Sequence, residues 1–321
     1  MPLLPEIYIV PPRSQPNGHF QTIIPNLTRK VNGIEFERER IDTWDDDFLD
    51  LDWIKQGNSK LVIVTHGLAG NSRAEYIKGI SKIMSNNKYD ILAWNYRGCG
   101  GEPNRKLTSF HGGKTDDLDW VIKHAIASND YDAIYLVGVS MGGNLTLKYV
   151  GEMKHKLNKI IKKAFAVSAP IDMLATSHQL IKGWNQIYSR RYLKQYIEQL
   201  KLKEKLFPGQ WDFEKVYKSA NLHDFVENFT AKIFGFKDAA EYLASQSALH
   251  YLENIKIPTI LVNADNDPFL TEKSFPKEIA RNSDYFHFEM TINGGHVGFM
   301  EKEDKEFNWM EKRILDFFEE N

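Results

Sequence analysis

The stretch IYLVGVSMGGNLTLKYV, residues 134–150, joins an apolar run rich in β-branched residues to a segment with helical character. At the junction, Gly138 to Gly142 match the pattern G-x-S-x-G, with Ser140 at the centre. A serine on so sharp a strand-to-helix turn has strained backbone angles, and its neighbours two positions away must lack side chains to avoid collision. The pattern therefore predicts a turn that presents Ser140 as a nucleophile. The competing interpretation is a Gly-rich phosphate-binding or packing turn.

Short apolar runs and helical stretches alternate around this turn. The apolar runs are nearly continuous, as in strands covered on both faces, and comprise residues 60–67, 90–98, 132–140, 162–170 and 257–265. The helical stretches comprise residues 71–87, 114–130 and 141–157. This alternation predicts an α/β fold with a mostly parallel, doubly wound sheet. Two segments that alternate apolar and polar residues, 34–41 and 48–54, predict an N-terminal antiparallel hairpin.

The alternation stops after Pro170. From about Asp172 to Phe236 the sequence has helical periodicity and no convincing buried strand. Beyond this block a strand is predicted over 285–291, and a final amphipathic helix from about Asp304 to Glu319. We therefore predict three parts, which are an N-terminal arm packed on the core (1–33), an α/β core (34–171 and 237–321) and a helical cap or lid inserted into it (172–236).

Composition and charge narrow the class of protein. The chain of 321 residues has a formal net charge of −2, so no overall field favours nucleic acid as a partner. Its apolar stretches fall short of the about 20 residues of a membrane span, and its start lacks the basic region of a secretory signal. Together with a single cysteine, Cys99, these features predict a soluble, cytoplasmic protein. They indicate no oligomeric state.

A neutral serine hydroxyl needs a base, and the base needs an orienting carboxylate. Where a doubly wound fold places a serine on such a turn, the partners follow it in the order acid, then histidine. His296 lies in the glycine-flanked loop NGGHVGF, between the last predicted strand and the last helix, and is the predicted base. Asp267, just outside the preceding strand and before Pro268, is the predicted acid. Asp265 is the alternative carboxylate.

Two backbone amides are predicted to bind an oxyanion. The helix that begins at Met141 offers unpaired N–H groups beside Ser140. A second donor is expected from the loop THGLAGNS, residues 65–72, where small residues permit close backbone approach. We assign the oxyanion hole to the amides of Leu68 and Met141. His66 competes as a base, but its position directly after a strand favours a structural hydrogen bond.

Seven segments in this order resemble the YheT-like branch of the α/β-hydrolase fold superfamily, the AB hydrolase type-4 family. They are NGHFQTIIP, DDDFLDLDW, HGLAGNSRAEYI, NYRGCGGEPN, GVSMGGN, NADNDPF and GGHVGF, and they span nearly the whole chain. By position, the resemblance implies a catalytic triad of Ser140, Asp267 and His296. It also implies an ester-hydrolysing enzyme with no metal and no organic cofactor.

Two other groups of residues have competing interpretations. The acidic run Asp45–Asp47 lacks the spacing of a calcium loop, and we interpret it as a solvated hairpin turn. We interpret Cys99 as a small residue in a tight Gly-rich loop, residues 95–104, in preference to a reactive thiol. The residues alone suggest no mechanistic role for this loop.

The predicted cap carries a basic amphipathic stretch. Between Leu180 and Lys205, seven lysine or arginine residues stand against two glutamates, a local charge of +5. Such a helix can lie on an anionic lipid surface, or it can be an ordinary lid with its apolar face on a pocket and its lysines in water. We favour the lid without membrane binding. Trp184 and Tyr188 are the candidate substrate contacts within it.

These features together predict a serine esterase of the lipase-like class. Its expected substrates are small-molecule or lipid-like carboxylic esters with an apolar acyl chain, cleaved through an acyl-enzyme on Ser140. Acyl transfer or thioester cleavage by the same residues is one alternative, and non-catalytic ligand binding on the same fold is the other.

Overall fold

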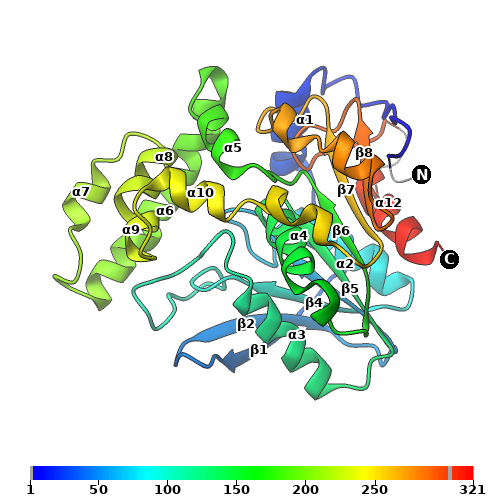
Figure 1. Ribbon diagram of the computed structural model, residues 1–321, viewed down its shortest axis with the longest axis horizontal. Coiled ribbons are helices and arrows are strands. Elements are labelled where there is room, and N and C mark those ends of the chain that lie inside the picture. The colour runs from blue at the N-terminus through cyan, green and yellow to red at the C-terminus, as the bar shows by residue number, and fades with distance from the viewer. Residues whose placement is uncertain (1–2, 303–305, 321) are drawn as a thin grey trace.

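A single eight-stranded sheet organises the computed structural model, which describes residues 3–302 and 306–320 (Figure 1). The strand order is β1-β2-β4-β3-β5-β6-β7-β8. Only β1 with β2 and β2 with β4 pair antiparallel, and the other neighbours are parallel. The strands are β1 (Glu37–Asp42), β2 (Phe48–Ile54), β3 (Lys60–Thr65), β4 (Asp90–Asn95), β5 (Ala133–Val139), β6 (Ile161–Val167), β7 (Thr259–Ala264) and β8 (Phe286–Thr291).

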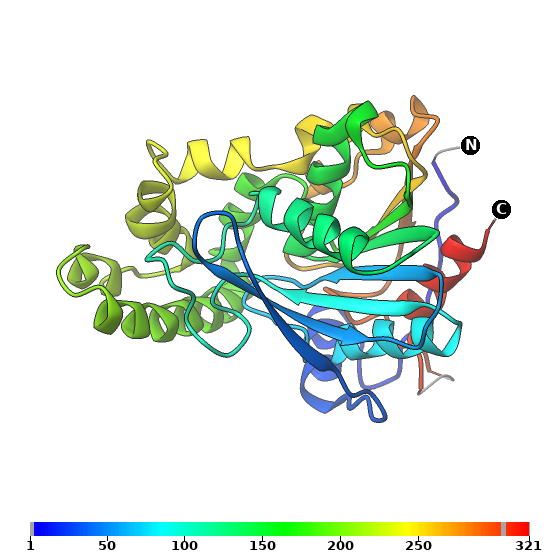
Figure 2. The same ribbon diagram turned by 90° about the horizontal axis from the view of Figure 1, so that it is seen from below.

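Helices cover both faces of this sheet (Figure 2). The helices of the described residues, including those beyond the sheet, are α1 (Gly18–Thr28), α2 (Glu75–Asn86), α3 (Asp116–Ser128), α4 (Met141–Met153), α5 (Met173–Leu180), α6 (Gln186–Leu206), α7 (Phe213–Tyr217), α8 (Leu222–Phe225), α9 (Ala231–Ile233), α10 (Ala239–Ser245), α11 (Lys277–Arg281) and α12 (Trp309–Glu319). The predicted fold class, a mostly parallel sheet with an antiparallel hairpin at its start, is confirmed.

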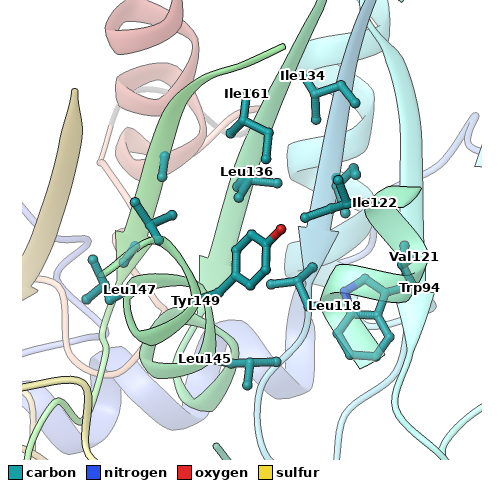
Figure 3. Close-up of a cluster of buried hydrophobic side chains, with 14 of the residues drawn as sticks. Trp94, Leu118, Val121, Ile122, Ile134, Leu136, Leu145, Leu147, Tyr149 and Ile161 are labelled. Carbon is teal, nitrogen blue, oxygen red and sulfur yellow. The ribbon is translucent and has the colours of Figure 1, made fainter. Parts of the chain in front are cut away.

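Two hydrophobic cores lie on the two faces, which explains the continuous apolar runs of the sequence. On β5, Ile134 and Leu136 join the cluster beneath α3 and α4, as the close-up in Figure 3 shows. The alternate residues Tyr135 and Val137 join the opposite cluster, which includes residues of α2 and α12. Because successive strand side chains point to opposite faces, a central strand must be apolar at every position. Each fully buried leucine or isoleucine contributes roughly 1.5–3 kcal/mol.

The edge hairpin is held by charge pairs across its register. Arg38 lies opposite Asp52 and donates to both carboxylate oxygens, at 2.6 and 2.8 Å. Arg40 lies opposite Asp50 and does the same, at 2.8 and 3.1 Å. Such bidentate pairs fix the register of β1 on β2, and a charged edge strand does not invite pairing with another chain.

The N-terminal segment contacts the last strand of the sheet and contains a helix. Leu3 and Ile7 form parallel bridges to β8, and Asn17 caps α1 by accepting from the amide of Phe20. At the other end of the chain, α12 begins at Trp309 after an Asn308 capping box. The predicted start of this helix near Asp304 falls outside the described residues.

Between β6 and β7 the chain is helical. Helices α5 to α10 and a 3-10 segment, η4 (Ala248–Asn254), fill this block, and no strand lies between Val167 and Thr259. Figure 1 shows α6 to α10 gathered at one end of the molecule, opposite the chain termini. The domain boundaries at 171/172 and 236/237 stay a prediction. No helix within residues 3–302 and 306–320 is both long and apolar enough to cross a bilayer.

A buried lysine ties this helical block to the Gly-rich loop 95–104. Lys203 of α6 donates to the main-chain and side-chain oxygens of Asn104, at 2.7 and 2.5 Å, and to the carbonyl of Lys106. Burial lowers the pKa of Lys203 to about 8. The expectation that the lysines of this helix lie in water is wrong for Lys203. Its buried ammonium donates to three oxygen atoms of the protein and not to water.

The same loop is anchored to the edge hairpin, where the structure corrects a second expectation. Asp47 is fully buried, so the prediction of a solvated turn is wrong for this residue. Its carboxylate accepts from Asn104 at 2.6 Å and from Arg97 at 3.2 Å. Arg97 also donates to Asp45 and Asp117, both at 2.7 Å. The loop 95–104 is therefore a structural junction that joins hairpin, core and helical block.

Replacing Arg97 by Met should lower the free energy of unfolding by about 3–5 kcal/mol, because the buried Asp47 and Asp117 would lose their cationic partner. The matched variant Arg281→Met removes an exposed pair with Glu278 and should cost less than about 1 kcal/mol. Urea unfolding followed by circular dichroism measures both. Equal losses in the two variants would contradict the structural role of Arg97.

Candidate active site

The turn after β5 is strained in the way the sequence pattern predicts. Ser140 has φ 55° and ψ −120°, a conformation that L-residues rarely adopt. A Cβ on Gly138 would lie 2.3 Å from the carbonyl oxygen of Gly142. A Cβ on Gly142 would lie 2.2 Å from the carbonyl oxygen of Thr65. Any side chain at either glycine would therefore force the turn apart.

Three predicted side chains form one hydrogen-bonded row at the carboxyl edge of the sheet. The Nε2 atom of His296 lies 2.8 Å from Ser140 Oγ, and its Nδ1 atom lies 2.8 Å from Asp267 Oδ2. Because a carboxylate only accepts, Nδ1 carries the proton and Nε2 is free to accept from the serine hydroxyl. Asp267 and His296 are buried, whereas the alternative carboxylate, Asp265, is exposed.

The acid and the imidazole are held by the loop that follows β7. The amide of Asp267 donates to the carbonyl of Ala264 at 3.1 Å, and Asp267 Oδ1 accepts from the amide of Phe269 at 2.8 Å. The Phe269 ring stacks on the His296 ring, with centroids 4.1 Å apart. One carboxylate oxygen is thus committed to the loop and the other to the imidazole. This arrangement fixes the ring plane of His296.

Helix α1 holds the histidine loop from the other side, a function that the residues alone did not reveal. Thr22 Oγ1 accepts from the amide of His296 at 2.9 Å, and Gln21 Oε1 accepts from the amide of Gly294 at 2.8 Å. The approach is close, since a Cβ on Gly298 would lie 2.0 Å from the carbonyl oxygen of Gln21. The only signal in the sequence was the segment NGHFQTIIP, quoted for the family resemblance without a role.

The predicted oxyanion donors lie beside the serine. Leu68 and Met141 both line a cavity next to it, and the loop of Leu68 packs on the turn, since a Cβ on Gly67 would lie 3.0 Å from Ser140 Cβ. Among the described residues, no hydrogen bond is found from the amide of Leu68 or Met141. The assignment of these amides to an oxyanion hole stays a prediction.

His66 is not part of the row. It is buried, its Nδ1 lies 2.8 Å from the carbonyl of Gly67, and its Nε2 accepts from the amide of Tyr96 at 3.3 Å. Burial lowers the pKa of His66 to about 4, so the ring is neutral at pH 7. Cys99 is likewise buried, and burial raises the pKa of its thiol to about 12. A thiol with so high a pKa is not a reactive nucleophile.

Two cavities meet at this point, and they differ in character. One, of about 350 Å³, contains Ser140 and His296 and is bordered by α1, by the start of α2 and by Tyr188 and Tyr192 of α6. The other, of about 310 Å³, lies between the core and the helical block. Leu68 lines both cavities. The second is mostly apolar, and its lining includes Phe110, Met141, Met173, Leu180, Tyr196 and Phe225.

The two candidate substrate contacts of the helical block lie in different places. Tyr188 is buried, lines the cavity that contains Ser140, and packs edge-on against Phe269 with ring centroids 4.6 Å apart. Trp184 lines neither cavity, and its side chain is 77% exposed. It belongs to a short 3-10 turn, η2 (Gly183–Asn185), that precedes α6.

A metal ligand set is not found in the described part of the chain. Among residues 3–302 and 306–320, no group of three or more His, Cys, Asp or Glu side chains is arranged to hold a metal ion.

Comparison with known proteins places the chain among related sequences and structures. A family model for the alpha/beta hydrolase fold matches residues 60–303. The putative esterase YheT of Escherichia coli (strain K12) is 29% identical over 315 residues, covering 96% of this chain and 92% of that protein. The phospholipase ABHD3 of Mus musculus is 27% identical over 291 residues, covering 88% and 70%. The esterase Pf2001 of Pyrococcus furiosus matches with a TM-score of 0.61 at 20% identity over 98% of each chain, a likeness of fold alone.

Replacing Thr22 by Val should slow the reaction of Ser140 with an activated fluorophosphonate by roughly tenfold, because a buried amide of His296 would lose its acceptor. Thr22→Ser retains a hydroxyl and should stay within about threefold of the parent chain. Thr28→Val, at an exposed hydroxyl of the same helix, is the matched control and should have no effect. Quenched time courses of fluorophosphonate labelling measure the rate for all three variants. Equal rates in the two valine variants would show that α1 does not position the imidazole.

Proposed function

The chain belongs to the α/β-hydrolase fold family, in its YheT-like branch, and we propose that it is a serine hydrolase that cleaves carboxylic esters. The observation that carries the proposal is the row of Ser140, His296 and Asp267, with both connecting distances at 2.8 Å. Hydroxyl, imidazole and carboxylate in this order are the parts that acyl transfer through a serine requires. Two relatives named as an esterase and a phospholipase support the same class.

In the proposed mechanism, Ser140 Oγ attacks the ester carbonyl as His296 Nε2 takes its proton. The imidazolium that forms is stabilised by Asp267, and it then returns the proton to the leaving alcohol. Water then attacks the acyl-enzyme as His296 Nε2 takes its proton, and the imidazolium returns this proton to Ser140 Oγ. This step releases the acid and restores the serine. The bond to Asp267 fixes the tautomer that leaves Nε2 available for both transfers.

The tetrahedral intermediates place negative charge on the former carbonyl oxygen. We propose that the amides of Leu68 and Met141 receive it, since both residues flank Ser140 and Met141 is the first residue of α4. The start of a helix carries unpaired N–H groups and a partial positive charge, which favour an oxyanion. Each donor of this kind typically contributes about 10²–10³ in turnover.

We propose that the apolar cavity receives the acyl chain. It is bordered by the same two residues as the proposed oxyanion hole, so a carbonyl bound there directs its chain beneath the helical block. A volume of about 310 Å³ with an apolar lining fits a medium-length chain better than an acetyl group. The helical block accordingly acts as a cap that supplies one wall of the acyl site.

The purified chain should hydrolyse p-nitrophenyl esters and react stoichiometrically with a fluorophosphonate. Ser140→Ala should lose both activities, with turnover down by at least about 10³, because the nucleophile is removed. Ser128→Ala, at a serine outside the row, is the matched control and should retain both. A folded parent chain that reacts with no activated acyl compound and no serine probe would refute the proposal.

The preference for chain length tests the acyl site separately. Val226→Trp adds bulk inside the apolar cavity and should lower kcat/KM for p-nitrophenyl octanoate by roughly tenfold or more, as room for two or three methylenes is lost. Turnover of the acetate should change by less than about threefold. Val10→Trp, at an exposed position on the N-terminal segment, is the control. Equal losses on both esters would place the acyl chain elsewhere.

A further inference from the structure

Exposed apolar side chains lie on α1 and at the start of α6, two elements that border the cavity containing Ser140. They are Phe20 (48%) and Leu27 (66%) on α1, Trp184 (77%) in the turn η2 just before α6, and Ile187 (54%) in its first turn. We call this set the rim. Exposed apolar residues scattered singly need no explanation, but several on two neighbouring elements mark an interaction surface.

The two halves of this rim are joined by direct contacts. His19 Nδ1 on α1 lies 3.1 Å from the hydroxyl of Tyr188 on α6, and Arg191 of α6 donates to Asn26 of α1 at 3.2 Å. Residues of both helices line the cavity that contains Ser140. Helices α1 and α6 are therefore in direct contact and border one opening.

The two segments that carry the rim are basic. Residues 17–30 and 181–197 contain no aspartate or glutamate, in a chain that has 43 acidic residues. Four basic side chains of the second segment are exposed, and these are Lys182, Arg190, Arg191 and Lys194. Among the described contacts, the guanidinium groups of Arg190 and Arg191 meet only the side-chain oxygens of Gln186 and Asn26. The charges of these two arginines are therefore uncompensated, whereas Lys194 lies 4.0 Å from Glu198, just beyond the segment.

The sequence alone favoured a lid without membrane binding. From the exposed side chains of the folded chain we propose instead that this rim of Phe20, Leu27, Trp184 and Ile187, together with the four basic residues of 181–197, docks the protein on an anionic lipid surface. Tryptophan and aliphatic side chains enter the boundary between headgroups and acyl chains, and arginine and lysine attract anionic headgroups. A rim of both kinds around one opening presents that opening to the lipid. The exposure of Trp184, which has no role in either cavity, is thereby accounted for.

Binding to vesicles tests the inference apart from the proposed hydrolysis. The Ser140→Ala chain should co-sediment with vesicles of phosphatidylcholine and phosphatidylglycerol at least tenfold more tightly than with pure phosphatidylcholine. Raising sodium chloride to 0.5 M should weaken binding severalfold, because screening removes the attraction to headgroups. Ile187→Ser combined with Leu27→Ser should reduce binding at least tenfold.

The controls keep failure of folding separate from failure of docking. Leu206→Ser, at an exposed leucine at the far end of α6, should bind vesicles within about twofold of the parent. The rim variants, made with Ser140 intact, should still label with a fluorophosphonate at the parent rate. No binding to anionic vesicles, or binding that the rim variants leave unchanged, would overturn the inference. So would self-association through the rim, in which the double variant abolishes a dimer and lipid has no effect.

Discussion

The backbone of Ser140 is the constraint on which the rest of the site depends. A serine with φ 55° is held there only because β5, α4 and the loop after β3 approach so closely that glycine alone fits at positions 138 and 142. The surrounding sheet maintains this strained conformation, because its central strands are buried on both faces. The hydroxyl is therefore aimed before any substrate arrives. The imidazole needs a comparable restraint, and it comes from three separate sources: the Asp267 loop, the stacked ring of Phe269 and the first helix of the chain.

Those features of the fold that follow from periodicity were predictable from the residues. Unbroken apolar runs at 60–67, 90–98 and 132–140 indicate strands covered on both sides, and the structure places them at the centre of a parallel sheet. Chain order and loop position likewise favoured His296 over nine other histidines and Asp267 over Asp265, and the structure brings these two residues together with Ser140. In both cases a local pattern carries the information, because the carboxyl ends of parallel strands meet at one edge.

What the residues did not reveal depends on contacts between distant segments. Gln21 and Gly294 are 273 positions apart. Nothing in the sequence around either residue predicts that the amide of Gly294 donates to the side chain of Gln21. Asp47 looked like a solvated turn residue because its partners, Arg97 and Asn104, come from a loop about 50 residues further along. Trp184 looked like a pocket residue because an amphipathic pattern does not distinguish the face turned to a cavity from a face turned to solvent.

The union of the first helix with the histidine loop also bears on how the protein is made. A ribosome releases α1 long before the loop at residues 294–298 exists, since the partners Gln21 and Gly294 are 273 positions apart. During that interval the serine turn can already form, since its glycines and neighbouring strands are complete by Val167. His296 and the Asp267 loop that holds its imidazole, however, have not yet been synthesised. The row can therefore assemble only after residue 296 has been synthesised, and a nascent chain that has not reached it carries an unactivated serine.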